Sequence, residues 1–75
     1  MKSWENDNVF VEYDNEKHII DIADLKTLEV CTTLGSNQEQ ILNAWESTMR
    51  IFNENTTFAE VKKVIKDNDI TLWSK

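Results

Sequence analysis

Residues 36–66 read SNQEQILNAWESTMRIFNENTTFAEVKKVIK and carry the strongest structural pattern in the chain. Their apolar residues recur at the three- and four-residue spacing of amphipathic helices, and the polar turn Asn53–Thr56 separates two such runs. The residues expected to be buried are Ile41, Leu42, Trp45, Met49 and Phe52 in the first helix and Phe58, Val61 and Ile65 in the second. Most large apolar side chains of the chain are in this set, so the helix pair should build much of the core.

Both helices begin with a capping-box pattern. In Ser36-Asn37-Gln38-Glu39, the serine hydroxyl can accept from the backbone N–H of Glu39, and the glutamate can accept from the N–H of Ser36. Thr57 and Glu60 repeat the same spacing before the second helix. We therefore expect the helices to start directly after Ser36 and Thr57.

Strand patterns precede and follow the helix pair. Residues 9–13 and 18–22 are rich in β-branched and aromatic side chains, place Val9, Val11 and Tyr13 and then Ile20 and Ile22 on one face each, and flank a polar turn, which predicts a β-hairpin. Residues 28–34 and 70–73 add two further strands of β-branched and apolar composition. Residues 22–28 fit a loop or a helical turn, and the loop is favoured because strand composition resumes directly after it.

The resulting order, βββααβ, predicts an α+β fold with an antiparallel sheet of three to four strands and two helices packed on one face. We expect residues 9–75 to form one small domain and residues 1–8 to be a flexible polar tail. Trp4 should fold back from this tail onto the domain, because so large an apolar side chain is seldom left in water. Trp4 and Trp73 could stack across an edge of the sheet.

The sheet face without helices should carry an unusual mixture of side chains. The residues expected there are Phe10, Glu12, Ile19, Asp21, Glu29 and Cys31. A face that meets only solvent is usually polar. The mixture of apolar and acidic groups therefore indicates a binding surface.

Charge is distributed unevenly along the 75 residues. The formal net charge is −6, and residues 1–29 hold eight acidic side chains against three lysines, which gives −5 for this segment. An acidic field repels nucleic acid and attracts basic partners. The N-terminal half therefore predicts a surface for a basic protein. The simpler alternative is that the acidity only keeps a small domain in solution.

Composition also bears on the compartment. Cys31 has no second cysteine to pair with, which suits a reducing compartment. No apolar leader follows Met1, and no run approaches the roughly 20 apolar residues needed to cross a bilayer. We expect a cytoplasmic protein that does not contact a membrane, with a homodimer as an open possibility.

The function that we expect is that of a small acidic binding module or inhibitor that docks on a basic site of a protein partner. The expected contact residues are Phe10, Glu12, Tyr13, Asp14, Glu16, Asp21, Asp24, Glu29 and Trp73. Such a surface could imitate nucleic-acid phosphates and block a nucleic-acid enzyme, and several inhibitors of nucleic-acid enzymes that come from phages and mobile elements share this size and charge. The alternative is a nucleic-acid-binding regulator that uses the helix pair as a helix-turn-helix, with Lys62, Lys63 and Lys66 against phosphates.

Catalytic and metal-binding patterns are weak. His18 and Cys31 could form a base and nucleophile pair, but the sequence offers no third orienting group and no glycine for an oxyanion hole. Asp67-Asn68-Asp69 starts like a calcium loop but lacks its glycine and its distal glutamate. We therefore expect no enzymatic activity, no cofactor and no bound metal.

Overall fold

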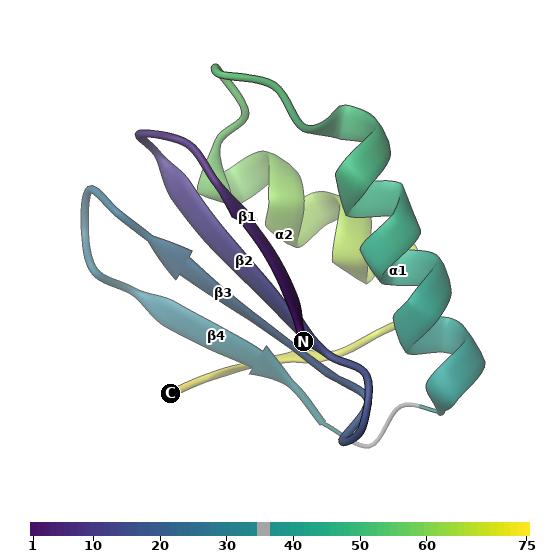
Figure 1. Ribbon diagram of the computed structural model, residues 1–75. Helices are drawn as coiled ribbons and strands as arrows, with labels where there is room; N and C mark the ends of the chain where they lie inside the picture. Colours follow the sequence, from purple (N-terminus) through teal and green to yellow (C-terminus); the bar gives the residue numbers. More distant parts are fainter. Residues whose placement is uncertain (35–36) are drawn as a thin grey trace.

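Within the described residues, 1–34 and 37–75 of a computed structural model, five antiparallel strands form one sheet and two helices pack on one of its faces (Figure 1). The elements are β1 (Lys2–Glu5), β2 (Val9–Asp14), β3 (Ile19–Asp24), β4 (Val30–Thr33), α1 (Gln38–Ile51), α2 (Phe58–Lys66) and β5 (Leu72–Ser74). The strands lie side by side in the order β1-β2-β3-β4-β5. The predicted α+β class is confirmed, and the sheet has one strand more than the largest number predicted.

The core lies between the sheet and the helices. Val9, Val11 and Tyr13 alternate onto this side of β2 and are buried, as their spacing predicts. Ile20 and Ile22 do the same on β3. Tyr13 stacks on Trp45 of α1, with ring centroids 5.5 Å apart. These contacts fix which face of the sheet the helices cover.

The prediction of a flexible tail over residues 1–8 was wrong. Residues 2–5 form the edge strand β1, and Trp4 pairs with Val11 and packs against the core. The Asn6 side-chain amide donates to the backbone oxygens of Asn53 and Thr56, at 2.9 Å each. These bonds hold the β1–β2 turn against the α1–α2 turn (Figure 1). A polar segment is thus ordered by contacts distant in sequence, which composition does not show.

Trp4 folds back as predicted, but it does not stack on Trp73. β1 and β5 are opposite edges of the sheet. Trp4 lies opposite Val11 on the side of the helices, whereas Trp73 lies opposite Thr32 on the other face. The five-strand order therefore keeps the two rings apart.

α1 buries a different stripe from the one predicted. Ile41 and Trp45 are buried as expected, but they are joined by Ala44 and Thr48. Leu42, Met49 and Phe52 are 42%, 45% and 36% exposed. Two small residues let the helix approach the sheet closely, and the Thr48 hydroxyl can be buried because it donates to the Trp45 backbone oxygen at 2.7 Å.

The helix starts are determined by their caps. The Asn37 side chain accepts from the Gln40 N–H at 2.8 Å and is the N-cap of α1, while the predicted cap Ser36 lies outside the described residues. The predicted capping box of Thr57 and Glu60 is present at the start of α2. Phe58, Val61 and Ile65 form the buried stripe of this helix, as predicted.

The last strand before the helices is shorter than predicted, and its faces are exchanged. β4 runs from Val30 to Thr33, and Cys31 lies opposite Ile22 on the buried side. The register follows from the turn after β3, where the Asp24 N–H donates to the Glu29 oxygen at 2.8 Å. Both faces of this segment carry apolar or β-branched residues, so only the register could decide between them.

Candidate docking surface on the open sheet face

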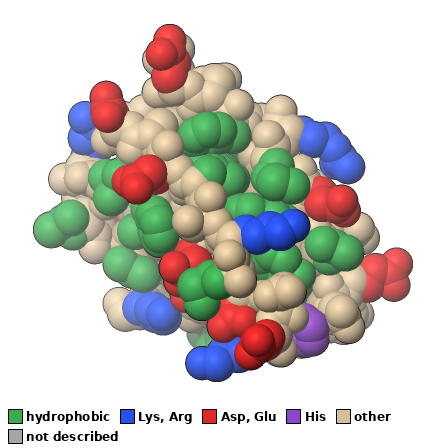
Figure 2. Space-filling model, in the orientation of Figure 1, with side chains coloured by type: hydrophobic (Ala, Val, Ile, Leu, Met, Phe, Trp, Pro, Cys, Tyr) green, Lys and Arg blue, Asp and Glu red, His purple; other side chains and the backbone are tan. Residues whose placement is uncertain are grey.

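The sheet face opposite the helices, which we call the open face, is the candidate functional site. Its side chains follow from the strand registers and include Ser3 and Glu5 of β1, Phe10, Glu12 and Asp14 of β2, Ile19, Asp21 and Ala23 of β3, Val30 and Thr32 of β4, and Trp73 of β5. Figure 2, which views the molecule with the sheet in front of α2, shows hydrophobic and acidic side chains intermixed on this side. The open face therefore has the mixed character that the sequence predicts.

Two carboxylates face each other at the centre of this surface. Glu12 of β2 lies directly opposite Asp21 of β3 in the sheet register. Like charges in such a pair destabilise a sheet. The Nζ of Lys75 lies 3.3 Å from Asp21 Oδ1, an ion pair that relieves part of this repulsion. Because the Asp21 and Lys75 side chains are 30% and 54% exposed, this pair adds little stability.

A shallow hollow of about 340 Å³ lies over the end of β2 and the start of β3. Three carboxylates, those of Glu12, Asp14 and Asp21, line it together with the ammonium groups of Lys17 and Lys75. Ile19 and Leu34 add apolar surface to the same hollow. Such a site suits a cationic group carried on an apolar stem, as in lysine and arginine side chains.

Asp14 and Asp24 serve first to shape the turns. Asp14 Oδ1 accepts from the backbone N–H groups of Lys17 and Glu16, at 3.1 and 2.9 Å, and these bonds lower the pKa of its carboxyl group. Asp24 Oδ1 accepts from the N–H groups of Lys26 and Thr27, at 2.8 and 3.2 Å. The bond from Lys26 is the main cause of a lowered pKa for Asp24.

Three predicted contact residues do not lie on the open face. Tyr13 is 5% exposed and belongs to the core. Asp24 pairs with Val9 at the end of the sheet, in register with residues that face the helices. Glu29 forms an ion pair with Lys62 of α2, with Oε2 and Nζ 3.5 Å apart. The alternation of β2 accounts for Tyr13, the alternation of β3 for Asp24, and the shorter β4, which begins after Glu29, for Glu29.

The remaining predicted contacts are accessible. Phe10, Glu12, Asp14 and Asp21 are half-buried on the open face, Trp73 is 53% exposed there, and Glu16 is exposed on the β2–β3 turn. Glu5 joins this face although it was not predicted. Once β1 is recognised as a strand, its alternation around Trp4 places Glu5 on the open face.

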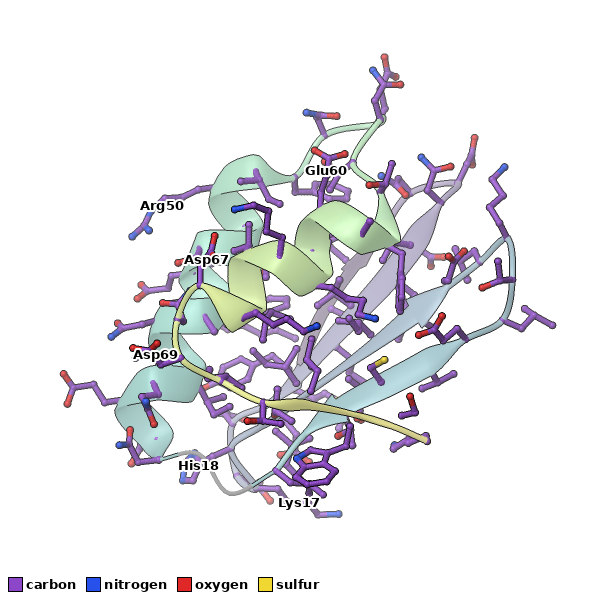
Figure 3. The ribbon with its side chains drawn as sticks, turned by 180° about the vertical axis from the view of Figure 1, so that it is seen from behind. Lys17, His18, Arg50, Glu60, Asp67 and Asp69 are labelled. Atoms are coloured by element: carbon purple, nitrogen blue, oxygen red, sulfur yellow. The ribbon has the colours of Figure 1, made fainter. Side chains whose placement is uncertain are left out.

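His18 and Cys31 are not neighbours. His18 lies in the β2–β3 turn, whereas Cys31 lies opposite Ile22, four residues further along β3, which is about 13 Å in a strand. Figure 3 shows His18 and Lys17 together at the turn. Burial of Cys31 raises the pKa of its thiol. The two side chains therefore cannot act as a nucleophile and its base in this arrangement.

The lysines of α2 are partly neutralised. Lys62 pairs with Glu29 and lies 5.3 Å from the centre of the Phe58 ring. Lys63 Nζ lies 3.0 Å from Asp67 Oδ2, one helical turn away. Lys66 is exposed. Two of the three cations predicted to meet phosphates thus already have acidic partners, which weakens a nucleic-acid-binding surface on this helix.

Over the described ranges, 1–34 and 37–75, no three His, Cys, Asp or Glu side chains gather closely enough to hold a metal ion. In the same part of the chain, no helix is both long and apolar enough to cross a bilayer. Comparison of the chain with protein-family models, with curated proteins and with solved structures finds no match.

Proposed function

We propose that this protein is a binding module that docks its open face on a basic site of a partner protein. The observation that carries the proposal is the mixed composition of an uncovered sheet face: four carboxylates stand among exposed or half-buried apolar side chains. The carboxylates are those of Glu5, Glu12, Asp14 and Asp21. Large apolar side chains are unfavourable on a face that contacts only water, and their presence there is typical of a binding surface.

Each component of the open face has a separate role in this proposal. The carboxylates steer a basic partner toward the face and speed association. Phe10 and Trp73 supply apolar area that is removed from water in the complex, and exposed Trp is a frequent hot spot of interfaces. The helices hold the face in shape from behind.

A narrower form of the proposal is that the partner is a nucleic-acid enzyme whose basic groove the open face occupies. Carboxylates on neighbouring strands would then stand in for phosphates. This form predicts that the protein and a DNA duplex compete for the same enzyme. Competition that does not depend on Glu5 and Glu12 would count against it.

The proposal is tested by capturing binding proteins from a lysate of host cells on the immobilised protein. The test variant is Glu5→Lys/Glu12→Lys, because no side-chain hydrogen bond of either residue occurs within the described part of the chain and folding should persist. The matched control is Asp67→Lys/Asp69→Lys, which makes the same change of charge on two exposed residues between α2 and β5, off the open face. We expect the test variant to lose a basic protein that the wild type and the control retain.

Binding should also weaken as the salt concentration rises. Dissolved ions screen exposed charges that are further apart than the Debye length, which is about 8 Å near physiological ionic strength. A captured protein that binds the wild type and Glu5→Lys/Glu12→Lys equally, in low and in high salt, would contradict docking through the open face.

A further inference from the structure

A second surface lies on the flank of α1, away from the open face. Leu42, Met49 and Phe52 follow one another along this flank at spacings of seven and three residues, and all three are exposed. From Leu42 to Phe52 the stripe extends about 15 Å along the helix. Large apolar side chains gathered in this way on a surface mark a binding site more often than single exposed ones do.

The packing of α1 does not need these side chains. The helix faces the sheet with Ile41, Ala44, Trp45 and Thr48. The flank of α1 toward α2 contacts the α2–β5 turn. There, the Ser47 hydroxyl lies 3.4 Å from the side-chain amide of Asn68. Leu42 and Met49 lie on the opposite flank of the helix wheel, and Phe52 follows directly as the C-cap of α1, where its ring contacts Trp4.

The stripe continues onto the sheet through an aromatic contact. The Phe52 ring lies 4.0 Å from the Trp4 ring of β1, between centroids, at an interplanar angle of 46°. The apolar surface therefore extends from α1 to the edge strand. Figure 2 shows hydrophobic side chains over the region where Figure 1 places β1 and α1.

Acidic groups border this apolar stripe. Glu39 and Glu46 are exposed on α1 beside Leu42 and Met49, and Glu5, Asp7 and Glu54 line a shallow hollow beside Phe52. Arg50 is the one cation of α1 and projects away from the helix (Figure 3). Lys2 of β1, which shares the side of Trp4, adds a second cation, so the five acidic groups give the border a net negative charge.

We propose that this flank binds an amphipathic helix of a partner protein, with an apolar face for the stripe and lysine or arginine beside it. Leu42 and Met49 on α1, with Phe52 just beyond its end, offer an elongated apolar surface for the i, i+3, i+4, i+7 anchors of a bound helix. The acidic border complements basic flanking residues. A second copy of this chain would bring like-charged borders together at a net charge of −6 per chain. Apart from Glu5, which borders both surfaces, this site uses no residue of the open face.

The test uses a labelled model peptide of about 14 residues that contains only leucine and lysine, arranged to form an amphipathic helix. Fluorescence anisotropy measures its Kd. We expect Leu42→Gln/Met49→Gln to raise the Kd at least about tenfold. Gln keeps the helix propensity of Leu and Met, so α1 should persist.

Two controls separate this site from other surfaces. Leu28 is 77% exposed on the β3–β4 turn, and Leu28→Gln should leave the Kd within about twofold. Glu12→Lys, on the open face, should do the same at about 0.5 M salt, where attraction of the peptide's lysines to the open face is screened. A peptide of equal composition with strictly alternating leucine and lysine, which favours a strand, should bind at least about tenfold more weakly than the helical peptide.

Two results would overturn the inference. One is an unchanged Kd for Leu42→Gln/Met49→Gln. The other is a wild-type dimer in sedimentation equilibrium that Leu42→Gln/Met49→Gln dissociates, because a second copy would then occupy the flank. Loss of peptide binding in Glu12→Lys alone would assign the peptide to the open face instead.

Discussion

At the scale of single residues, acidic side chains of similar appearance in the sequence have different roles. Glu5 and Glu12 project from the open face, whereas Glu29 is paired with Lys62 beside α2. Asp14 and Asp24 accept backbone N–H groups in the two hairpin turns. The Asp14 carboxylate serves the turn and the hollow at once, so its substitution would confuse a test of binding.

The turn carboxylates give a prediction about pH. Their pKa values are lowered in the folded protein from the usual 3.8, chiefly by the N–H groups of Lys17 for Asp14 and of Lys26 for Asp24. A lowered folded pKa stabilises the protein above the unfolded pKa, and this contribution is lost as pH falls through the folded pKa. We expect the free energy of unfolding in urea to decrease below about pH 4.

The matching variant is Asp14→Ala/Asp24→Ala. It should be less stable than the wild type at pH 7, and the difference should shrink toward pH 2. Glu16→Ala serves as the control, since it removes a charge from the β2–β3 turn without removing a backbone acceptor. A difference between Asp14→Ala/Asp24→Ala and the wild type that stays constant from pH 7 to pH 2 would be inconsistent with this role.

At the scale of elements, the buried face of a strand or helix is predicted best where its apolar residues fit only one face. Val9, Val11 and Tyr13 alternate strictly, and Phe58, Val61 and Ile65 form a narrow stripe, so both buried faces could be predicted. α1 offers more large apolar residues than one face can hold, and the fit of Ala44 and Thr48 against the sheet decided its rotation.

Two other elements depended on contacts that no local pattern contains. β1 has the mixed sequence KSWE and becomes a strand through its pairing with β2 and the bonds of Asn6. The faces of β4 follow from its register with β3. The docking residues on these strands could therefore be predicted only in part.

The Asn6 contact gives a prediction at this scale. Its amide donates to two backbone oxygens, and its Oδ1 accepts from the N–H groups of Asn8 and Val9 at 2.7 and 2.9 Å. Asn6→Asp keeps the acceptor but places a carboxylate against the oxygens of Asn53 and Thr56. We expect a loss of about 2 kcal/mol in the free energy of unfolding, measured in urea at pH 7.

The control for this prediction is Asn55→Asp, an equal change on the exposed α1–α2 turn, which should alter stability by no more than about 0.5 kcal/mol. Equal stabilities of Asn6→Asp and Asn55→Asp would show that the contact between the two turns does not stabilise the fold.

At the scale of the whole molecule, the helix layer and the sheet layer have different proposed roles. The helices and the inner side of the sheet form the core, and this leaves the open face as a broad surface with four carboxylates. The flank of α1 is a second apolar surface at the β1 edge. A chain of 75 residues could thus contact partners on two separate surfaces.

The central claim is that the open face, and not acidity in general, binds basic groups. It is tested most directly by recording amide chemical shifts of the protein during titration with octa-arginine. We predict that the shifts concentrate at Phe10, Glu12 and Asp21, disappear in Glu5→Lys/Glu12→Lys, and fade at about 0.5 M salt. Shifts of equal size at Asp67 and Asp69, unaltered in that variant, would contradict the claim.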